Sequence, residues 1–268
     1  MNATPDNTAV MTIAAYPVNQ LTILTPFIRT AQARKITPIV VMLGEPYSNY
    51  YELKITRFLA EIHKLPHKYK YILYADGSDV VFQGTMQGIC DKFNYIGELI
   101  LMGAETGLAP FKALRTYFPQ SKTPYAHPNA GVWMGEREVV VDSLEMAEKV
   151  RLLHPNDHPI EPRLGMTMFN HDQGMWHYLF LYNLIPFGVD YHAQLVLNTC
   201  AVRKRDVSFS PTGLIDLRTG STPELIHFST GHRQWVGKYY RYLRKVHGVD
   251  IDTPVFKADV EQYVLKGR

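Results

Sequence analysis

The stretch YKYILYADGSDVVF, from Tyr69 to Phe82, decides the fold class of this chain. Its apolar run over residues 71–75 predicts a buried strand, which the chain leaves at Asp76-Gly-Ser-Asp79. Two carboxylates separated by a glycine and a serine can face one point, and Mg²⁺ and Mn²⁺ prefer carboxylate oxygen. A plain turn between two strands is also rich in Asp, Gly and Ser. Taken alone, the motif leaves a metal site and a structural turn equally open.

Apolar runs on either side of this stretch alternate with helical patterns. The predicted strands cover 10–15, 37–43 and 99–104, and the predicted helices cover 19–35, with a kink at Pro26, and 50–65. This alternation predicts an α/β fold with a mostly parallel sheet. Ligands bind at the carboxyl ends of the strands in such sheets, where Ala15, Asp76 and Glu105 fall. Their position favours the metal-site interpretation, in which a bound ion holds a diphosphate.

The second half of the chain is less regular. Residues 128–135 (PNAGVWMG) predict a small-residue turn into a short strand at 132–134. The other predicted elements are helices over 139–152 and 171–184, a proline-rich loop over 154–162, and a late strand over 225–228. The aromatic residues of the 171–184 helix are expected to lie in the core.

Composition limits the class of protein. The chain has 268 residues, 46% of them hydrophobic and 20% charged, which fits one large domain with a real core. Cys90 and Cys200 lie far apart and form neither a disulfide framework nor a zinc motif. The first seven residues lack a signal-peptide pattern, and no apolar run approaches about 18 residues. We therefore expect a cytoplasmic protein that does not cross a membrane.

Charge does not single out a partner, because the formal net charge is only +3. The segment Lys238-Tyr-Tyr-Arg-Tyr-Leu-Arg-Lys245 is nevertheless basic and aromatic. It could face a nucleic-acid backbone. An amphipathic helix with a solvated basic face is the preferred interpretation.

Several known motifs are missing from the sequence. The chain has no GxGxxG, GxSxG or HExxH pattern, and residues 231–238 have one residue too many for a Walker loop. His63 and His67 form an i, i+4 pair of a kind that is more often on the surface than bound to a metal.

Short motifs in a fixed order carry more information than any one of them. After the aspartate pair come Ala104-Glu105, Asn129-Ala-Gly131, His171-Asp-Gln173, Val189-Asp190 with Gln194, and His227-Phe-Ser-Thr-Gly231. This order resembles the GT-A nucleotide-sugar glycosyltransferases, and more closely the glycosyltransferase domain of the procollagen lysyl hydroxylases. The resemblance runs from about residue 10 to about residue 233. It implies a single Rossmann-like nucleotide-sugar-binding domain with a mixed central sheet.

The sequence departs from that family at four places. Ala130 stands for a serine, His171 for an aspartate, and HFSTG is one residue longer than the family's HGNG. The glycine-rich lead into the family's lysine is replaced before Lys54 by Ser-Asn-Tyr-Tyr. These changes agree with metal and nucleotide binding but leave the acceptor open.

The resemblance assigns roles to individual residues. Asp76, Asp79 and His227 would bind Mn²⁺ or Mg²⁺, and Asp172, Gln173 and Glu105 would be catalytic, with Asp172 accepting the acceptor proton or supporting the sugar cation. The donor would be bound by Ala14, Ala15, Lys54, Asp76, Ser78, Asn129, Gly131, Gly231 and Arg233. Asp190 and Gln194 would lie in a second layer or in the acceptor cleft.

Each role has a structural alternative. The less favoured alternatives are a buried strand histidine bonded to backbone for His227 and a helix N-cap for Asp172. For Glu105 the alternative is a cap or a strand-end ion pair. Lys54 and Arg233 fit ordinary surface charges, and Asn129 with Gly131 fits a plain turn.

The implied activity is transfer of glucose or galactose from a UDP-sugar to a hydroxyl. The acceptor is either hydroxylysine in a collagen-like protein or a hydroxylated pyrimidine in DNA, and the basic 238–245 segment favours DNA slightly. A metal-dependent phosphodiester or nucleotide hydrolase and a non-catalytic nucleotide-binding module are the competing hypotheses. We expect the transferase domain to cover residues 1–237 and a basic helical extension, packed on it, to cover 238–268.

Overall fold

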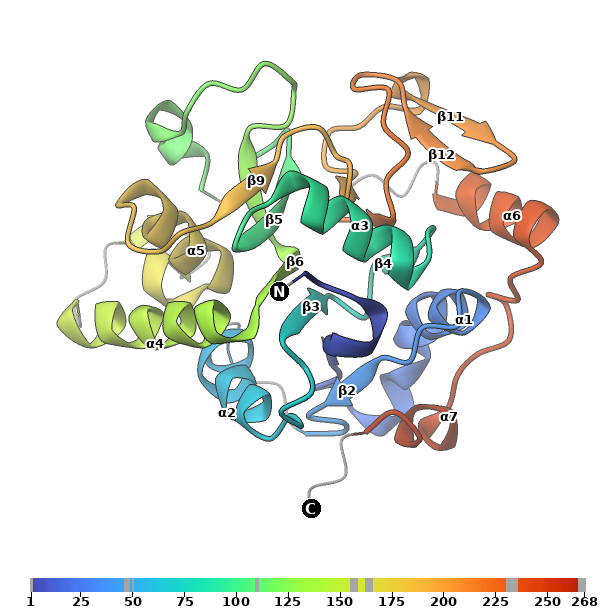
Figure 1. The fold of residues 1–268 in the computed structure, drawn as a ribbon, viewed down its shortest axis with the longest axis horizontal. Helices are drawn as coiled ribbons and strands as arrows, with labels where there is room; N and C mark the ends of the chain where they lie inside the picture. Colours follow the sequence, from blue (N-terminus) through green and yellow to red (C-terminus); the bar gives the residue numbers. More distant parts are fainter. Residues whose placement is uncertain are drawn as a thin grey trace.

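The computed structural model describes residues 2–45, 49, 51–108, 111–154, 159–161, 166–229 and 236–264. Strands and helices alternate over the first half of the chain, as the sequence predicts (Figure 1). The strands are β1 (Thr8–Ile13), β2 (Ile39–Val41), β3 (Tyr71–Ala75), β4 (Val80–Phe82), β5 (Ile100–Glu105), β6 (His127–Glu136), β7 (Pro159–Glu161), β8 (Met166–Thr167), β9 (Gly188–Asp190), β10 (Val196–Asn198), β11 (Val207–Ser210), β12 (Gly213–Asp216) and β13 (Leu225–His227). The helices are α1 (Thr25–Ala33), α2 (Phe58–His63), α3 (Met86–Ile96), α4 (Arg137–Leu153), α5 (Asp172–Leu181), α6 (Val236–His247) and α7 (Lys257–Glu261).

The central sheet has six strands in the order β2-β1-β3-β6-β5-β9. Three of its five neighbouring pairs are parallel, whereas β6 runs antiparallel to both β3 and β5. The mixed central sheet implied by the family resemblance is therefore confirmed. The mostly parallel sheet expected from strand and helix alternation holds only away from β6.

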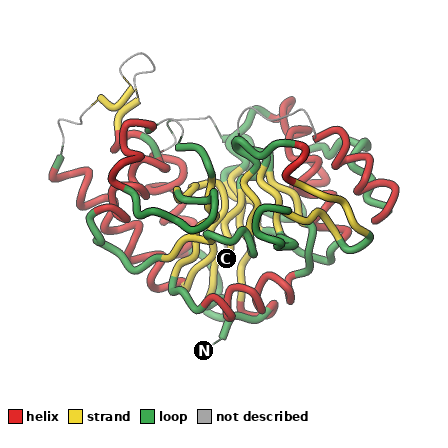
Figure 2. The backbone as a smooth tube through the Cα atoms, turned by 90° about the horizontal axis from the view of Figure 1, so that it is seen from above, coloured by secondary structure: helices red, strands yellow, loops and turns green. Residues whose placement is uncertain are grey.

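Each central strand supplies both faces of the sheet with apolar side chains. All five residues of β3 are buried, and successive side chains alternate between two hydrophobic clusters. Ile72 and Tyr74 pack on the side of α2, α4 and α5, while Leu73 and Ala75 pack on the side of α1 and α3. Helices accordingly lie on both sides of the strands (Figure 2). This two-sided burial explains why β3 reads as a continuous apolar run.

A smaller sheet, β10-β13-β4, receives the chain directly after the Asp76–Asp79 turn. Strand β4 is antiparallel to β13, with Val80 opposite His227. Strand β10 is parallel to β13, with Asn198 opposite His227. The aspartate turn thus joins the two sheets and brings a late histidine beside an early carboxylate.

Three predicted elements are corrected by the structure. The helix predicted over 19–35 begins as a 3-10 segment, Val18–Leu24, and Pro26 stands in the first turn of α1, where proline is tolerated, rather than at a kink. The helix predicted over 50–65 is π-helical over Glu52–Arg57 before α2 begins. In the loop predicted over 154–162, residues 155–158 and 162 lie outside the described residues, and Pro159–Glu161 form β7.

The turn predicted at Pro128-Asn-Ala-Gly is wrong. These residues belong to β6, which is ten residues long rather than three. Proline, asparagine and glycine usually mark turns. Here Asn129 and Gly131 face the site described below, and β3 and β5 supply the strand pairing of β6.

Helix α6 contains the basic segment and packs its apolar side into the core. Tyr239 and Leu243 are fully buried, whereas Lys238, Arg241 and Lys245 are exposed. The amphipathic-helix interpretation is therefore confirmed. The domain division at residue 237 stays a prediction. Among the described helices, none combines the length and the apolar character needed to cross a bilayer.

A buried histidine on α5 makes the fold sensitive to acid. The ring of His177 is fully buried, with Nε2 2.8 Å from the Pro128 carbonyl oxygen, and burial lowers its pKa to about 4. Because this pKa lies below the ordinary 6.5, the unfolded chain binds the proton more tightly. Stability should fall as the pH drops from about 6.5 to about 4, by up to about 3 kcal/mol for this group.

Urea unfolding at both ends of this pH range measures the effect. His177→Gln keeps a donor for Pro128 and removes the titration, so we expect its loss of stability on acidification to be smaller than that of the wild type. Equal losses in the two proteins would contradict this account.

Candidate active site

The Asp76–Asp79 turn continues β3 before it reverses. The Asp76 backbone N–H donates to Gly131 O at 2.8 Å, which extends the β3–β6 pairing by one bond, and Val80 N–H donates to Asp76 O at 3.2 Å. A Cβ built on Gly77 would lie 2.7 Å from Thr12 Oγ1, so only glycine fits against β1. These contacts therefore fix the backbone of the turn from which both carboxylates project.

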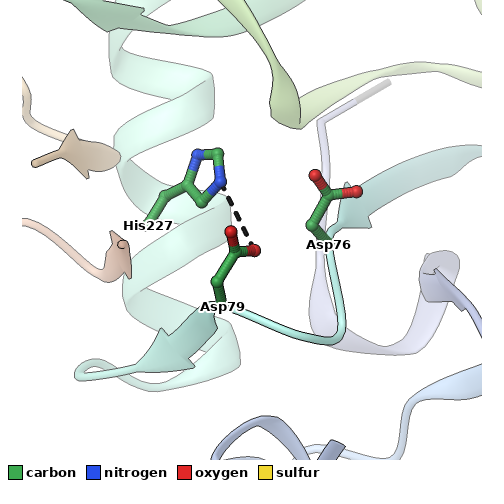
Figure 3. A group of neighbouring side chains, drawn as sticks. All are labelled: Asp76, Asp79 and His227. Carbon is green, nitrogen blue, oxygen red and sulfur yellow. Dashed lines mark ion pairs between the residues drawn. The ribbon is translucent and has the colours of Figure 1, made fainter. Parts of the chain in front are cut away.

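His227, the last residue of β13, completes a three-residue cluster with these aspartates. Its Nε2 lies 3.5 Å from Asp79 Oδ1, and one ligand atom from each of Asp76, Asp79 and His227 falls within 4.8 Å of the others (Figure 3). The Phe228 backbone N–H donates to Asp79 O at 2.8 Å and fixes the two segments together. His227 is a buried strand histidine, but its ring nitrogens contact the side chains of Asp79 and Asn198 rather than backbone.

The donor set fits a hard divalent cation. Two carboxylates and one imidazole are ligands that suit Mn²⁺ and also Mg²⁺, at bond lengths of about 2.0–2.3 Å. Ligand atoms that all lie within 4.8 Å of one another are close enough to reach one shared cation after small side-chain movements. The three side chains can therefore serve as ligands of one divalent cation.

The pKa values of Asp76, Asp79 and His227 are shifted by burial and by neighbouring charges. Burial raises the pKa of Asp76, although Lys54 opposes the shift. Burial acts in the same direction on Asp79, but His227, Lys54 and Ser78 together outweigh it and leave the pKa of Asp79 lowered. Burial acts to lower the pKa of His227, and Asp79 with Asp76 reverses this and raises it. Each of the three side chains thus shifts the pKa of its neighbours.

Lys54 connects the metal cluster to the predicted catalytic aspartate. It comes from the π-helical turn before α2, and such turns are frequent at functional sites. Its Nζ lies 2.8 Å from Asp76 Oδ1, 3.0 Å from Asp76 Oδ2 and 3.2 Å from Asp172 Oδ2. Burial opposes its charge, but Asp172 and Asp76 hold the pKa of Lys54 well above its usual value. The surface-charge alternative for Lys54 is wrong.

Asp172 is the first residue of α5, and its side chain is almost fully buried. The N-cap is His171, and no side chain caps the helix, so the N-cap alternative for Asp172 is wrong. Its other oxygen, Oδ1, lies 3.2 Å from His171 Nδ1. The carboxylate therefore faces the site between a lysine and a histidine.

A second group of predicted residues forms a hydrogen-bonded chain beside the cluster. Asn129 Nδ2 donates to Glu105 Oε2 at 2.8 Å and to Gln173 Oε1 at 3.2 Å. Asn129 Oδ1 in turn accepts from Gly131 N–H at 2.9 Å. All three polar side chains are buried, so β5, β6 and α5 meet at this point.

Gly131 lies directly under the histidine ring. A Cβ built there would be 2.2 Å from His227 Cε1, 2.8 Å from Nε2 and 2.9 Å from Nδ1. The family resemblance implies that Gly131 binds the donor, and this role stays a prediction. The geometry adds a structural reason for the glycine, which is to make room for the imidazole.

Gly131→Ala should therefore displace the His227 ring and weaken Mn²⁺ binding by at least about tenfold, with about 1–3 kcal/mol of lost stability from overpacking. Calorimetric titration with Mn²⁺ measures the affinity. Gly237→Ala is the matched control, because among the described residues its added Cβ would meet only Arg241, at 3.9 Å. Wild-type affinity in Gly131→Ala would contradict the assigned role.

The remaining predicted donor-site residues are placed as follows. Ala14 and Ala15 are buried at the carboxyl end of β1, and Ser78 Oγ donates to Asp79 Oδ1 at 3.4 Å. Gly231 and Arg233 lie outside the described residues.

Asp190 organises a turn. Its carboxylate accepts the backbone N–H groups of Gln194, Leu195 and Val196 at 2.7–2.9 Å. This carboxylate fixes the start of β10, and the acceptor-cleft role of Asp190 and Gln194 stays a prediction.

Two residues of the site were not predicted. Tyr74 OH donates to Asp76 Oδ1 at 2.5 Å, although tyrosine reads as part of the apolar run of β3. Asn198 lies 2.5 Å from His227 Nδ1. Its signal is a single polar residue that ends the apolar stretch Leu195-Val-Leu-Asn198.

Comparison with known proteins gives two findings. The family model described as "PLOD GT domain" matches residues 4–151, which is more than half of the chain. A glycosyltransferase involved in the glycosylation of the major capsid of PBCV-1 has a similar structure, with a TM-score of 0.48 and 13% identity over 87% of this chain and 98% of its own. At that TM-score the likeness supports no conclusion about substrate. No protein with a curated description matches the chain.

The family match includes only part of the site. Lys54, Asp76, Asp79 and the Glu105–Asn129 pair lie inside residues 4–151, whereas α5 and His227 lie beyond them.

Proposed function

The chain belongs to the PLOD GT domain family, and thus to the GT-A glycosyltransferases, and we propose that it moves a hexose from a UDP-sugar to an acceptor hydroxyl in a metal-dependent reaction. Glucose and galactose are the proposed sugars. The observation that carries the proposal is the convergence of Asp76, Asp79 and His227, within 4.8 Å, beside a buried lysine and a buried carboxylate.

Asp76, Asp79 and His227 would hold the cation, Mn²⁺ or Mg²⁺. When bound, it supplies positive charge that stabilises the two phosphates of the departing UDP. Lys54 adds a second fixed positive charge beside Asp76 and can donate to a phosphate or sugar oxygen.

In the transfer itself, the acceptor oxygen forms a bond to the anomeric carbon, and the bond from that carbon to the phosphate oxygen breaks with its electron pair leaving on UDP. The acceptor hydroxyl loses its proton. Asp172 is the proposed group that takes this proton or supports the cationic sugar, which requires it to come within about 3 Å of its target. Glu105, Asn129 and Gln173 would bond sugar hydroxyls through their shared network.

For the acceptor, we propose a hydroxylated pyrimidine base in DNA. The exposed cations Lys238, Arg241 and Lys245 on α6 support this proposal, because they present positive charge along one helix face. If DNA binds there, its affinity should fall steeply as salt rises. If the protein instead glycosylates hydroxylysine in a collagen-like peptide, with no such salt dependence, the acceptor is a protein and not DNA.

The hydrolase hypothesis is weaker. Most metal-dependent hydrolases of phosphodiesters hold two cations. Within the ranges that the structure describes, Asp76, Asp79 and His227 form the one group of at least three potential metal ligands.

The test is UDP release from UDP-glucose and UDP-galactose, with Mn²⁺ and then with excess EDTA, in the presence of hydroxymethylated DNA or hydroxylysine peptide. The expected result is release that depends on one sugar, requires the acceptor and stops with EDTA. Release of UMP or of free phosphate instead would identify a hydrolase. Binding of UDP-sugar without any turnover would identify a binding module.

A further inference from the structure

The side chain of Asn198 is the direct partner of the proposed metal-binding histidine. Asn198 ends β10 and stands opposite His227 in the parallel β10–β13 pairing. Its Oδ1 lies 2.5 Å from His227 Nδ1, and both residues are buried. The contact is therefore made out of reach of water, on the side of the ring away from Asp79.

The orientation of the Asn198 amide is fixed by its second contact. Its Nδ2 donates to the carbonyl oxygen of Ala104 at 2.9 Å. A flipped amide would place two acceptor oxygens against each other, so the oxygen must face the imidazole. Strand β5 leaves room for this contact, because a Cβ built on Gly103 would lie 2.9 Å from Asn198 Nδ2.

A carbonyl oxygen accepts hydrogen bonds and cannot donate them. His227 Nδ1 must therefore carry a proton to bond Asn198. In the neutral ring, Nε2 then keeps its lone pair, and Nε2 is the atom that faces Asp79. The chain from Ala104 O through Asn198 to His227 thus selects one of the two imidazole tautomers.

We propose that Asn198 is a positioning residue, which holds His227 in the tautomer and ring orientation needed to bind a divalent cation through Nε2. This inference rests on the proposed metal site, and it assigns a role to a residue outside the metal cluster itself. It also explains why a fully buried amide ends an otherwise apolar strand.

Two measurements test the proposal. Long-range ¹H–¹⁵N NMR of the metal-free protein, at an alkaline pH where the ring is neutral, reads the tautomer of His227, and His227→Gln assigns the signal. Calorimetric titration with Mn²⁺ reads the affinity of wild type, Asn198→Asp and Asn198→Leu. Asn94→Leu is the control. Asn94 likewise donates to one backbone group and accepts from another, both of Ala3, which is not a residue of the site.

We expect wild-type His227 to be protonated at Nδ1. Asn198→Leu should weaken Mn²⁺ binding by about 10–100-fold and give a mixture of tautomers. Asn198→Asp retains an acceptor for Nδ1–H and should keep both the tautomer and an affinity within a few-fold, even if losing the bond to Ala104 lowers its stability. Asn94→Leu should bind Mn²⁺ as the wild type does.

Three results would overturn the proposal: a wild-type ring protonated at Nε2, wild-type affinity in Asn198→Leu, or equal losses in Asn198→Asp and Asn198→Leu. If Asn198→Leu does not fold, the wild-type tautomer and Asn198→Asp decide the question. A wild type that binds neither Mn²⁺ nor Mg²⁺ would refute the proposed metal site, and the role of Asn198 with it. A wild type that binds Mn²⁺ but transfers no sugar would refute only the transferase activity.

Discussion

Asp79→Asn is expected to reduce metal-dependent UDP release by at least about a thousandfold. The substitution keeps the shape of the side chain and removes one of two negative charges in the cluster. A Lewis-acid cation contributes several kcal/mol to stabilising a leaving phosphate, and each 1.4 kcal/mol corresponds to about tenfold in rate. The Asp79 side chain is 34% exposed, so its replacement should leave the fold intact. Mn²⁺ titration should show the loss of affinity directly.

The matched control is Asp91→Asn, which removes an exposed carboxylate whose Oδ1 accepts from Gln87 on α3. Its rate and Mn²⁺ affinity should equal those of the wild type. If Asp79→Asn retained both full activity and EDTA sensitivity, the cation would have to be held elsewhere. If it retained activity that EDTA does not affect, the reaction would need no metal.

The central strand and the place of Asp76 and Asp79 directly after it could be predicted from local sequence, for a physical reason. Strand β3 is buried on both faces, so its letters form an uninterrupted apolar run with sharp limits at Tyr71 and Ala75. The first polar residue after that run, Asp76, then lies at the sheet edge where ligands bind. The strand signal is local, and the place of Asp76 needs only the α/β class that strand and helix alternation predicts.

Strand β6 shows where local signals fail. Pro128, Asn129 and Gly131 have the composition of a turn. Their place in a strand is decided by distant partners: Gly131 O accepts from Asp76, and Asn129 bonds Glu105 and Gln173. Tertiary contacts override the local preference, and those contacts belong to the site.

The links between motifs could not be predicted from the motifs themselves. Lys54 was predicted to bind the donor, but its bridge between Asp76 and Asp172 depends on a π-helical turn that has no clear sequence signature. Asn198 was missed because its partner, His227, is defined only by the pairing of β10 with β13. The sequence shows which residue types are present, whereas the contacts between these side chains depend on how the strands pair in the folded sheet.

Asp172→Asn is expected to lower kcat by about 10²–10⁴-fold and to leave Mn²⁺ affinity within a few-fold of wild type. The rate loss is that typical of removing a general base or a charged group at the reacting centre. The metal affinity should survive because Asp172 is not one of the three clustered ligands. Stopped assays of UDP release, with donor concentration varied, separate kcat from KM.

Asp172 also holds Lys54, so a rate loss alone does not establish contact with the reacting atoms. A double-mutant cycle with Lys54→Met resolves this ambiguity. If Asp172 acts only by positioning the lysine, adding Asp172→Asn to Lys54→Met should cost nothing more, because the partner is already gone. If Asp172 takes the acceptor proton, the second substitution should lower kcat by a further factor of at least about 10² in that background. An unchanged kcat in the single Asp172→Asn variant would remove Asp172 from both roles and return the search for the base to the Glu105–Asn129–Gln173 network.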